Sequence, residues 1–219
     1  MPFLSEVESE SGKAQGSVSV MRAPVSFANE ELILVDSDDR VIGYRNKFQT
    51  HEGAGVLHRA FSAFLFNHQG QLLVHQRSRE KPLWPGFWTN SCCSHPRRGE
   101  TIGSAVKRRI REELGIDAVA TSVYKFEYQA RYKNVGSEHE LCHVYLARAI
   151  GSEAISAHAE EVMEWRWLSL DEVDAWHTDS PEELTPWFRQ EWSALRTRYG
   201  AQLERFVQEI KAPGQRGAA

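Results

Sequence analysis

Thiol, imidazole and carboxylate side chains follow one another in a single stretch of this chain, WPGFWTNSCCSHPRRGETIGSAVKRRIREELG, which runs from Trp84 to Gly115. Cys93 and His95 lie in its first half, and Glu113 lies near its end. These side-chain types perform proton transfer and bind metal ions in enzymes. The stretch therefore predicts a functional site that the rest of the chain should complete.

Further candidate metal ligands lie on both sides of that stretch. His51 and His58 lie on or beside a glycine-containing loop, and neutral imidazole binds ions such as Zn²⁺ and Mn²⁺. Glu138 and Glu140 are two residues apart at the start of an expected strand, so their carboxylates should project from one face, roughly 7 Å apart. Facing water, they would form only a solvated edge. Together with three histidines, they would satisfy a roughly octahedral metal.

A helix is predicted from Thr101 to Leu114, because apolar residues recur there at four-residue spacing and Gly115 can end it. Its charged residues have two explanations. Arginine and glutamate four residues apart can form surface ion pairs worth about 0.3 kcal/mol each. Alternatively, the carboxylates face a site. The residues concerned are Arg108, Arg109, Glu112 and Glu113.

Consecutive strands, rather than alternating strands and helices, predict an α+β fold. Gly53 and Gly55 argue against a helix in the segment that joins two expected hairpins. Beyond Leu168 the pattern becomes helical, with Ser169 and Ser180 as expected caps. The strands are expected at 31–36, 41–46, 60–67, 71–76, 122–132, 141–148 and 162–168.

Composition limits the classes of function. We expect a single domain at residues 31–211, a disordered leader at 1–30 and a flexible tail at 212–219. A net charge of −4 provides no basic field for nonspecific nucleic-acid binding, and no apolar run approaches the roughly 20 residues of a membrane span. Three cysteines cannot form a regular disulfide framework. We therefore expect a cytoplasmic protein, a monomer, that binds a small molecule and neither nucleic acid nor membrane.

The central stretch resembles the Nudix signature, in which a loop, a helix and a loop supply carboxylates to a divalent metal that holds a diphosphate. Two positions depart from the signature: Ser94 replaces its leading glycine and Arg109 replaces a glutamate. In Nudix hydrolases that glutamate helps to bind the metals that drive cleavage. The residues on the expected spacing are Glu100, Arg108, Glu112, Glu113, Gly115 and Ile116.

A closer resemblance, from about Leu32 to Trp187, is to the type I isopentenyl-diphosphate isomerase family. It is carried, in this order, by HEGAGVLHRAFSAFLFN, QRSREKPLWPGFWTNSCCSHP, RRIREELG, FEYQARY and EHELCHVY. Ordinary Nudix hydrolases lack the TNSCCSHP element and the ExE strand together. The resemblance implies a Nudix-like mixed sheet with flanking helices. It also implies conversion of isopentenyl diphosphate to dimethylallyl diphosphate, through a tertiary carbocation, in isoprenoid biosynthesis.

The same resemblance implies residue roles. One Zn²⁺, Mn²⁺ or Mg²⁺ ion would be bound by His51, His58, His95, Glu138 and Glu140. Cys93 and Glu140 would be the acid–base pair, with Tyr128 supporting Glu140. The Mg²⁺ ion that accompanies the substrate diphosphate would be held by Glu113 and the Cys93 backbone carbonyl. The phosphates would be contacted by Lys47, Arg77, Lys81 and Arg109.

The hydrocarbon end of the substrate would face Trp187, whose indole can stabilise a developing cation. No GxGxxG element is present, so we expect neither flavin nor nicotinamide. Two other functions remain alternatives: a Nudix hydrolase of nucleoside diphosphate derivatives, and a noncatalytic Nudix-fold binding module. Arg109 argues against the hydrolase. The joint presence of Cys93, Glu113, Glu140 and the three histidines argues against the noncatalytic module.

Overall fold

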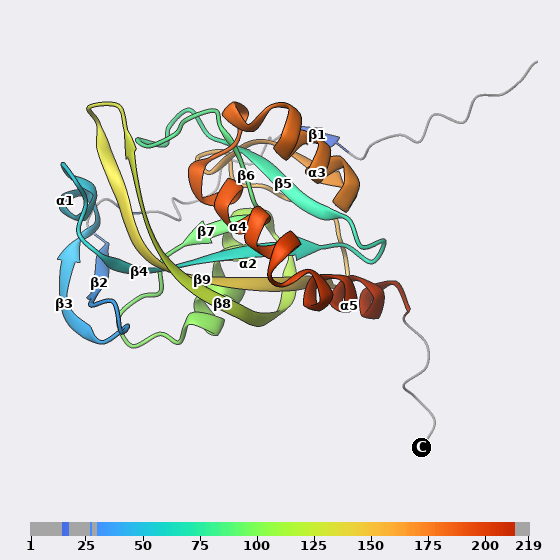
Figure 1. Ribbon diagram of the computed structural model, residues 1–219, viewed down its shortest axis with the longest axis horizontal. Coiled ribbons are helices and arrows are strands. Elements are labelled where there is room, and N and C mark those ends of the chain that lie inside the picture. The colour runs from blue at the N-terminus through green and yellow to red at the C-terminus, as the bar shows by residue number, and fades with distance from the viewer. Residues whose placement is uncertain (1–14, 18–26, 28–29, 213–219) are drawn as a thin grey trace, which may run out of the picture.

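The computed structural model describes residues 15–17, 27 and 30–212. A mixed β-sheet runs through the molecule, with helix α2 (Ile102–Leu114) behind it and helices α4 (Pro186–Thr197) and α5 (Gly200–Lys211) in front of it in Figure 1. This arrangement confirms the predicted α+β class. Among the described helices, none is long and apolar enough to cross a membrane.

The sheet has one long path and several branches. Along the path the strands are β1 (Gln15–Ser17), β10 (Val162–Leu168), β5 (Leu72–Arg77), β4 (His58–Phe66), β2 (Glu31–Val35) and β3 (Val41–Asn46). The branches are β6 (Trp88–Thr89) on β5, β7 (Cys92–Ser94) on β4, and β9 (Gly136–Ile150) on β4, with β8 (Asp117–Tyr132) beyond β9. The pairing of β4 with β9 is parallel, whereas the other described pairs are antiparallel.

Strand alternation divides the core between the two faces of the sheet. On β4, Phe61 and Leu65 pack in the cluster that contains α2, whereas Phe64 and Phe66 pack in the cluster that contains α4 and α5. Successive side chains on a strand point to opposite faces, so one apolar strand serves both clusters. The sheet therefore separates an α2 face from an α4 face, and these two names are kept below.

Helix α2 was predicted well because its signals are local. The Thr101 hydroxyl accepts a hydrogen bond from the Ser104 backbone N–H, and Gly115 ends the helix with φ of 73°. That left-handed conformation suits glycine, which has no Cβ to clash. The helix buries Val106, Ile110 and Leu114, as its spacing indicates.

The C-terminal helices agree with the sequence prediction except for one cap. Ser169 begins α3 (Leu170–Asp179) with a complete capping box that includes Glu172. Ser180 is not the expected cap, because its side chain makes no capping hydrogen bond and it precedes a short 3₁₀ helix, η1 (Pro181–Glu183). Helix α4 begins later, at Pro186, whose fixed φ suits the first helical position.

Two local expectations need correction, one on a helix and one on the length of a hairpin. A short helix, α1 (Lys47–His51), ends before Gly53, and the Asn46 side chain caps it by accepting from the backbone N–H groups of Phe48 and Gln49. The expected hairpin at 60–76 is present, because β4 and β5 are antiparallel neighbours, but their ladder pairs only at Phe66 and Leu72. It is short because β6 pairs with β5 and β7 pairs with β4 farther from the turn.

The N-terminal residues include one described strand. Residues 15–17, within the expected leader, form β1 and pair with β10. The rest of the predicted leader up to residue 29, apart from residue 27, lies outside the described residues, as does the predicted tail from 213 onward. Their expected disorder stays a prediction.

Candidate active site

A cluster of three histidines and one glutamate lies at one end of β4 and β9. His58 begins β4 and is paired in register with Glu140 of β9, while His51 ends α1 and His95 follows β7. One possible ligand atom from each of the four lies within 4.8 Å of the others. The His58 Nε2 and His95 Nε2 atoms are 3.1 Å apart, and His95 Nε2 is 3.3 Å from Glu140 Oε1.

Backbone carbonyls orient two of these imidazoles. His51 Nδ1 lies 2.7 Å from the Lys47 carbonyl oxygen, and His58 Nδ1 lies 2.8 Å from the Val56 carbonyl oxygen. A carbonyl can only accept, so each Nδ1 carries a hydrogen, and in the neutral imidazole each Nε2 would present a lone pair to the cluster. Converging lone pairs and a buried carboxylate oxygen are the donor set of a divalent-metal site, and the residues fit such an ion.

Glu138 borders this cluster. Its Oε2 atom lies 2.8 Å from His51 Nε2. Burial lowers the pKa of His51, but Glu138 and Glu140 outweigh burial and raise that pKa to about 9. The structure thus brings together the five predicted metal ligands, with four in one compact group and Glu138 against His51.

The Glu140 carboxylate has a second partner. Its Oε2 atom accepts a hydrogen bond of 2.8 Å from the Tyr128 hydroxyl, while Oε1 faces the histidines. Burial raises the pKa of Glu140, but the hydrogen bonds and charge supplied by His58, together with Tyr128, lower it overall. Glu140 is therefore ionised near neutral pH. Burial and the same carboxylate hold the pKa of Tyr128 well above its usual range, so Tyr128 keeps its proton.

Cys93 lies on the α4 face of β7, between two polar side chains. Its Sγ atom donates to Asn90 Oδ1 at 2.9 Å and lies 3.3 Å from the Ser62 hydroxyl oxygen. Burial raises the pKa of the thiol, and the charges of Glu191 and Glu140 act in the same direction. Cys93 therefore holds its proton at neutral pH.

The predicted phosphate-binding cations lie mainly among carboxylates. Arg109 forms ion pairs with Glu113 and with Glu161, whose Oε1 is 3.4 Å from Arg109 Nη2. The other Glu161 oxygen pairs with Lys81, and Lys47 lies 3.6 Å from Glu30. Burial lowers the pKa of Lys47, and the charges of Lys81 and Arg109 lower it further. Lys47, Lys81 and Arg109 thus each pair with a carboxylate and lie near enough to affect one another electrostatically.

Arg77, the fourth predicted cation, lies elsewhere. Its guanidinium donates to the carbonyl oxygens of Trp84 and Leu83, at 3.1 and 2.8 Å, and lies 5.1 Å from the centre of the Trp187 ring. Trp187 is buried against Trp84 and Tyr128, and its Nε1 donates to Thr89 Oγ1 at 3.0 Å. Arg77 therefore links the Trp187 ring to the loop after β5.

Comparison with known proteins places this arrangement. Residues 56–188 match the NUDIX domain family. The chain is 41% identical over 168 residues to isopentenyl-diphosphate Delta-isomerase 1 of Photorhabdus laumondii, covering 76% of this chain and 94% of that protein. It is 42% identical over 159 residues to the isopentenyl-diphosphate Delta-isomerase of Burkholderia multivorans, covering 73% and 89%. The chain belongs to the isopentenyl-diphosphate Delta-isomerase family, within the Nudix proteins.

The fold is also found in more distant proteins. The crystal structure of DR0079 from Deinococcus radiodurans aligns with a TM-score of 0.52 and 21% identity, over 84% of this chain and 100% of that chain. At this identity the likeness concerns the fold alone. Together with the family match it confirms the predicted Nudix-like architecture.

Several polar residues that contact the predicted ones were not predicted from the sequence. Asn90 lies inside the TNSCCSHP motif, which could have identified it as a partner of Cys93. Ser62, Glu161 and Glu191 stand in no recognisable motif. Their position beside the predicted residues follows only from the packing of β4, α4 and the segment before β10.

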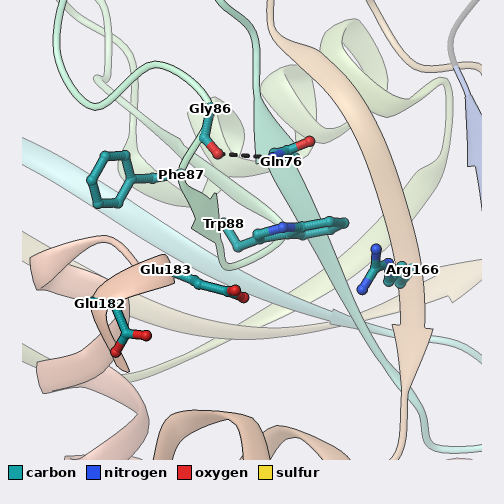
Figure 2. A pocket seen from close by; sticks show the side chains of 7 residues that line it. All are labelled: Gln76, Gly86, Phe87, Trp88, Arg166, Glu182 and Glu183. Atoms are coloured by element: carbon teal, nitrogen blue, oxygen red, sulfur yellow. Dashed lines mark hydrogen bonds between the residues drawn. The ribbon is translucent and has the colours of Figure 1, made fainter. Parts of the chain in front are cut away.

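A surface pocket of about 390 Å³ lies beside Phe87 and Trp88. Figure 2 shows Arg166 facing Trp88, with the carboxylates of Glu182 and Glu183 on the opposite side. The Arg166 guanidinium carbon is 4.3 Å from the centre of the Trp88 ring, which accounts for its position. The lining contains none of the predicted catalytic or metal-binding residues.

Proposed function

We propose that this chain converts isopentenyl diphosphate to dimethylallyl diphosphate, as the names of its relatives in Photorhabdus laumondii and Burkholderia multivorans suggest. The match covers most of this chain and nearly all of each relative. The proposed substrate is a small-molecule diphosphate, and we propose that the protein acts as a monomer in the cytoplasm.

The proposal is carried by two buried groups with opposite protonation states at neutral pH: a protonated thiol and an ionised carboxylate. Burial and neighbouring carboxylates raise the pKa of Cys93, whereas histidine and tyrosine partners lower the pKa of Glu140. A thiol that keeps its proton can act as an acid, and an ionised carboxylate can act as a base. A double-bond shift needs one of each.

The proposed reaction adds one proton and removes another, so it needs no redox cofactor. Cys93 gives its proton to C4 of the alkene, and the π electrons form the new C–H bond and leave a tertiary cation at C3. Glu140 then removes a proton from C2, and the electrons of that C–H bond form the C2=C3 double bond. The Trp187 indole would stabilise the cation by roughly 2 kcal/mol when water is excluded. Tyr128 would hold Glu140 in position.

The metal ligands are assigned in the same proposal. His51, His58, His95, Glu138 and Glu140 would hold one Zn²⁺, Mn²⁺ or Mg²⁺ ion, and Glu113 with the Cys93 carbonyl would hold the Mg²⁺ of the substrate. Bound cations would supply positive charge that balances carboxylates and phosphates. Lys47, Lys81 and Arg109 would grip the diphosphate, while Arg77 would hold the loop beside Trp187 or contact a phosphate.

Proton NMR of the purified protein in deuterated buffer tests the function. With isopentenyl diphosphate and Mg²⁺, we expect dimethylallyl diphosphate to appear with deuterium in the methyl group that C4 becomes. A parallel sample with nucleoside diphosphate derivatives monitors phosphate release. Phosphate release without isomerisation would instead identify a Nudix hydrolase. No turnover in either sample would identify a binding module.

A further inference from the structure

Glu191 is a fully buried carboxyl group that the proposed chemistry does not use. It lies on α4, one turn after Trp187, and has 0% exposure. Its Oε1 atom accepts a hydrogen bond of 3.5 Å from the Cys142 thiol, and its Oε2 atom has no hydrogen-bond partner among the described residues. An ionised carboxylate would be costly in such a place, so its presence calls for an explanation.

The Ser62 hydroxyl connects Glu191 to Cys93. It lies on the α4 face of β4, 3.3 Å from Cys93 Sγ and 3.5 Å from Cys142 Sγ, and it is hydrogen-bonded to the Glu191 carboxyl group. Ser62 is itself 1% exposed. One buried hydroxyl is therefore shared by the proposed proton donor and by Glu191.

The direction of these hydrogen bonds depends on whether Glu191 carries a proton. The Cys93 thiol donates to Asn90 Oδ1, so its sulfur is free to accept from Ser62. A hydroxyl has one hydrogen to donate. If Glu191 is ionised, Ser62 donates to Glu191. If Glu191 is neutral, it can donate to Ser62, and the hydrogen of Ser62 then points to Cys93.

Burial favours the neutral form. Burial raises the pKa of Glu191, the charge of Glu140 raises it further, and hydrogen bonds from Ser62 and Cys142 oppose the shift, leaving the pKa at about 8. The carboxyl group is thus mainly protonated at neutral pH. A neutral group also tolerates an unpartnered oxygen better than an anion does.

We propose that Glu191 is a positioning residue for Cys93, whose neutral carboxyl group directs the Ser62 hydroxyl to donate to the Cys93 sulfur. The inference rests on the proposed role of Cys93 as proton donor. When Cys93 gives up its proton, its sulfur becomes negative and the Ser62 hydrogen bond strengthens. An ionised Glu191 would withdraw that hydrogen bond and place a second negative charge nearby.

Among the titratable groups around Glu191, we expect Glu191 to be the one that loses its proton as pH rises above neutral. The groups around it are Glu140 and Cys142 on β9, Tyr124 on β8, Cys93 on β7 and Ser62 on β4. Burial holds the pKa values of the two thiols and of Tyr124 above their usual range, whereas Glu140 is already ionised. Glu191 therefore loses its proton first.

The test compares Glu191→Gln with Glu191→Leu, because the amide can still donate to Ser62 and the leucine cannot. We expect the wild-type kcat to fall as pH rises through about 8, and the Glu191→Gln variant to retain kcat near neutral pH and to lack that fall. Glu191→Leu and Ser62→Ala should each lower kcat about 10- to 100-fold with little change in KM. The double variant should lose no more than either single one.

Thermal melting of each variant separates loss of fold from loss of kcat. Additive losses in the double variant, or the same alkaline fall in wild type and Glu191→Gln, would overturn the proposal. Infrared spectra give a readout without substrate: the wild type should show a neutral-carboxyl band at about pH 6 that disappears by about pH 10, and Glu191→Gln should lack it. Wild-type protein that shows this band but no isomerisation would overturn the proposed function and leave the neutral state of Glu191 established.

Discussion

The two faces of the central sheet hold polar groups in contrasting ways. On the α4 face, Cys93, Ser62 and Glu191 share hydrogen bonds without a neighbouring cation among the described contacts. On the α2 face, Arg109 and Glu113 form a buried ion pair, and Glu161 joins Arg109 to Lys81. The polar groups of the α4 face are held as protonated, hydrogen-bonded groups, whereas those of the α2 face are held as ion pairs.

Under the proposed function, this difference predicts separate tasks for the two faces. A group that transfers a proton must keep it until the substrate arrives, which burial among neutral partners achieves. A diphosphate needs positive charge, which a buried site can hold only when carboxylates balance it. Changes on the α4 face should therefore lower kcat, and changes on the α2 face should weaken binding.

The largest effect is expected from Cys93→Ala. Removal of a proton donor lowers kcat by about 10²- to 10⁴-fold, whereas KM should change little because the diphosphate contacts remain. The rate of dimethylallyl diphosphate formation, followed by NMR, measures both parameters. A loss below about tenfold would mean that another group protonates the alkene.

His58→Gln should weaken metal binding at the proposed histidine and glutamate cluster. His58 presents Nε2 to His95 and Glu140 from a position with 0% exposure, and a neutral amide oxygen is a weaker ligand. We expect wild-type protein to contain about one divalent ion per chain and His58→Gln to contain much less. Elemental analysis measures this content.

Chelation supplies the matching control. Because a bound ion stabilises the folded state, a chelator should lower the melting temperature of the wild type and leave that of His58→Gln nearly unchanged. Equal responses of the two proteins would contradict the assignment of this cluster as a metal site.

Glu113→Gln should weaken substrate binding more than catalysis. Loss of one charge-assisted contact should raise the KM for the substrate, or the Mg²⁺ concentration required for half-maximal turnover, about 10- to 100-fold. The kcat should stay within a few-fold of the wild-type value. Glu112→Gln is the comparison, because Glu112 is more exposed than Glu113 and pairs with Arg108 as well as Arg109. Equal effects of the two substitutions on KM would remove the distinction between a binding carboxylate and a helix-surface carboxylate.

The features that the sequence predicted are those that depend on short segments. Thr101, Gly115 and the apolar spacing between them define α2 without reference to any other element. The Nudix and isomerase motifs likewise name Cys93 and His95 because those residues lie within one loop and one strand.

The features that the sequence did not predict depend on distant pairing. β4 was assigned to a hairpin with β5, whereas its long partner is β9, and this pairing places His58 opposite Glu140. Ser62 and Glu191 meet only because α4 covers that strand pair, so neither residue carries a local signal. Burial of a carboxyl group beside a serine becomes visible only when the packed faces are known.

The smallest effect on kcat is expected from Cys92→Ala, which compares the two faces at adjacent residues. Cys92 is a neighbour of Cys93 in β7, but alternation turns it to the α2 face, where it is fully buried in the apolar cluster with Val106 and Ile110. Removing its sulfur should lower the free energy of unfolding by about 1 kcal/mol, because a small buried apolar volume is lost. Denaturant titration measures this change, and kcat should remain near the wild-type value. A kcat loss as large as that of Cys93→Ala would contradict the inference that the face of β7 on which a cysteine lies decides whether its thiol takes part in the reaction.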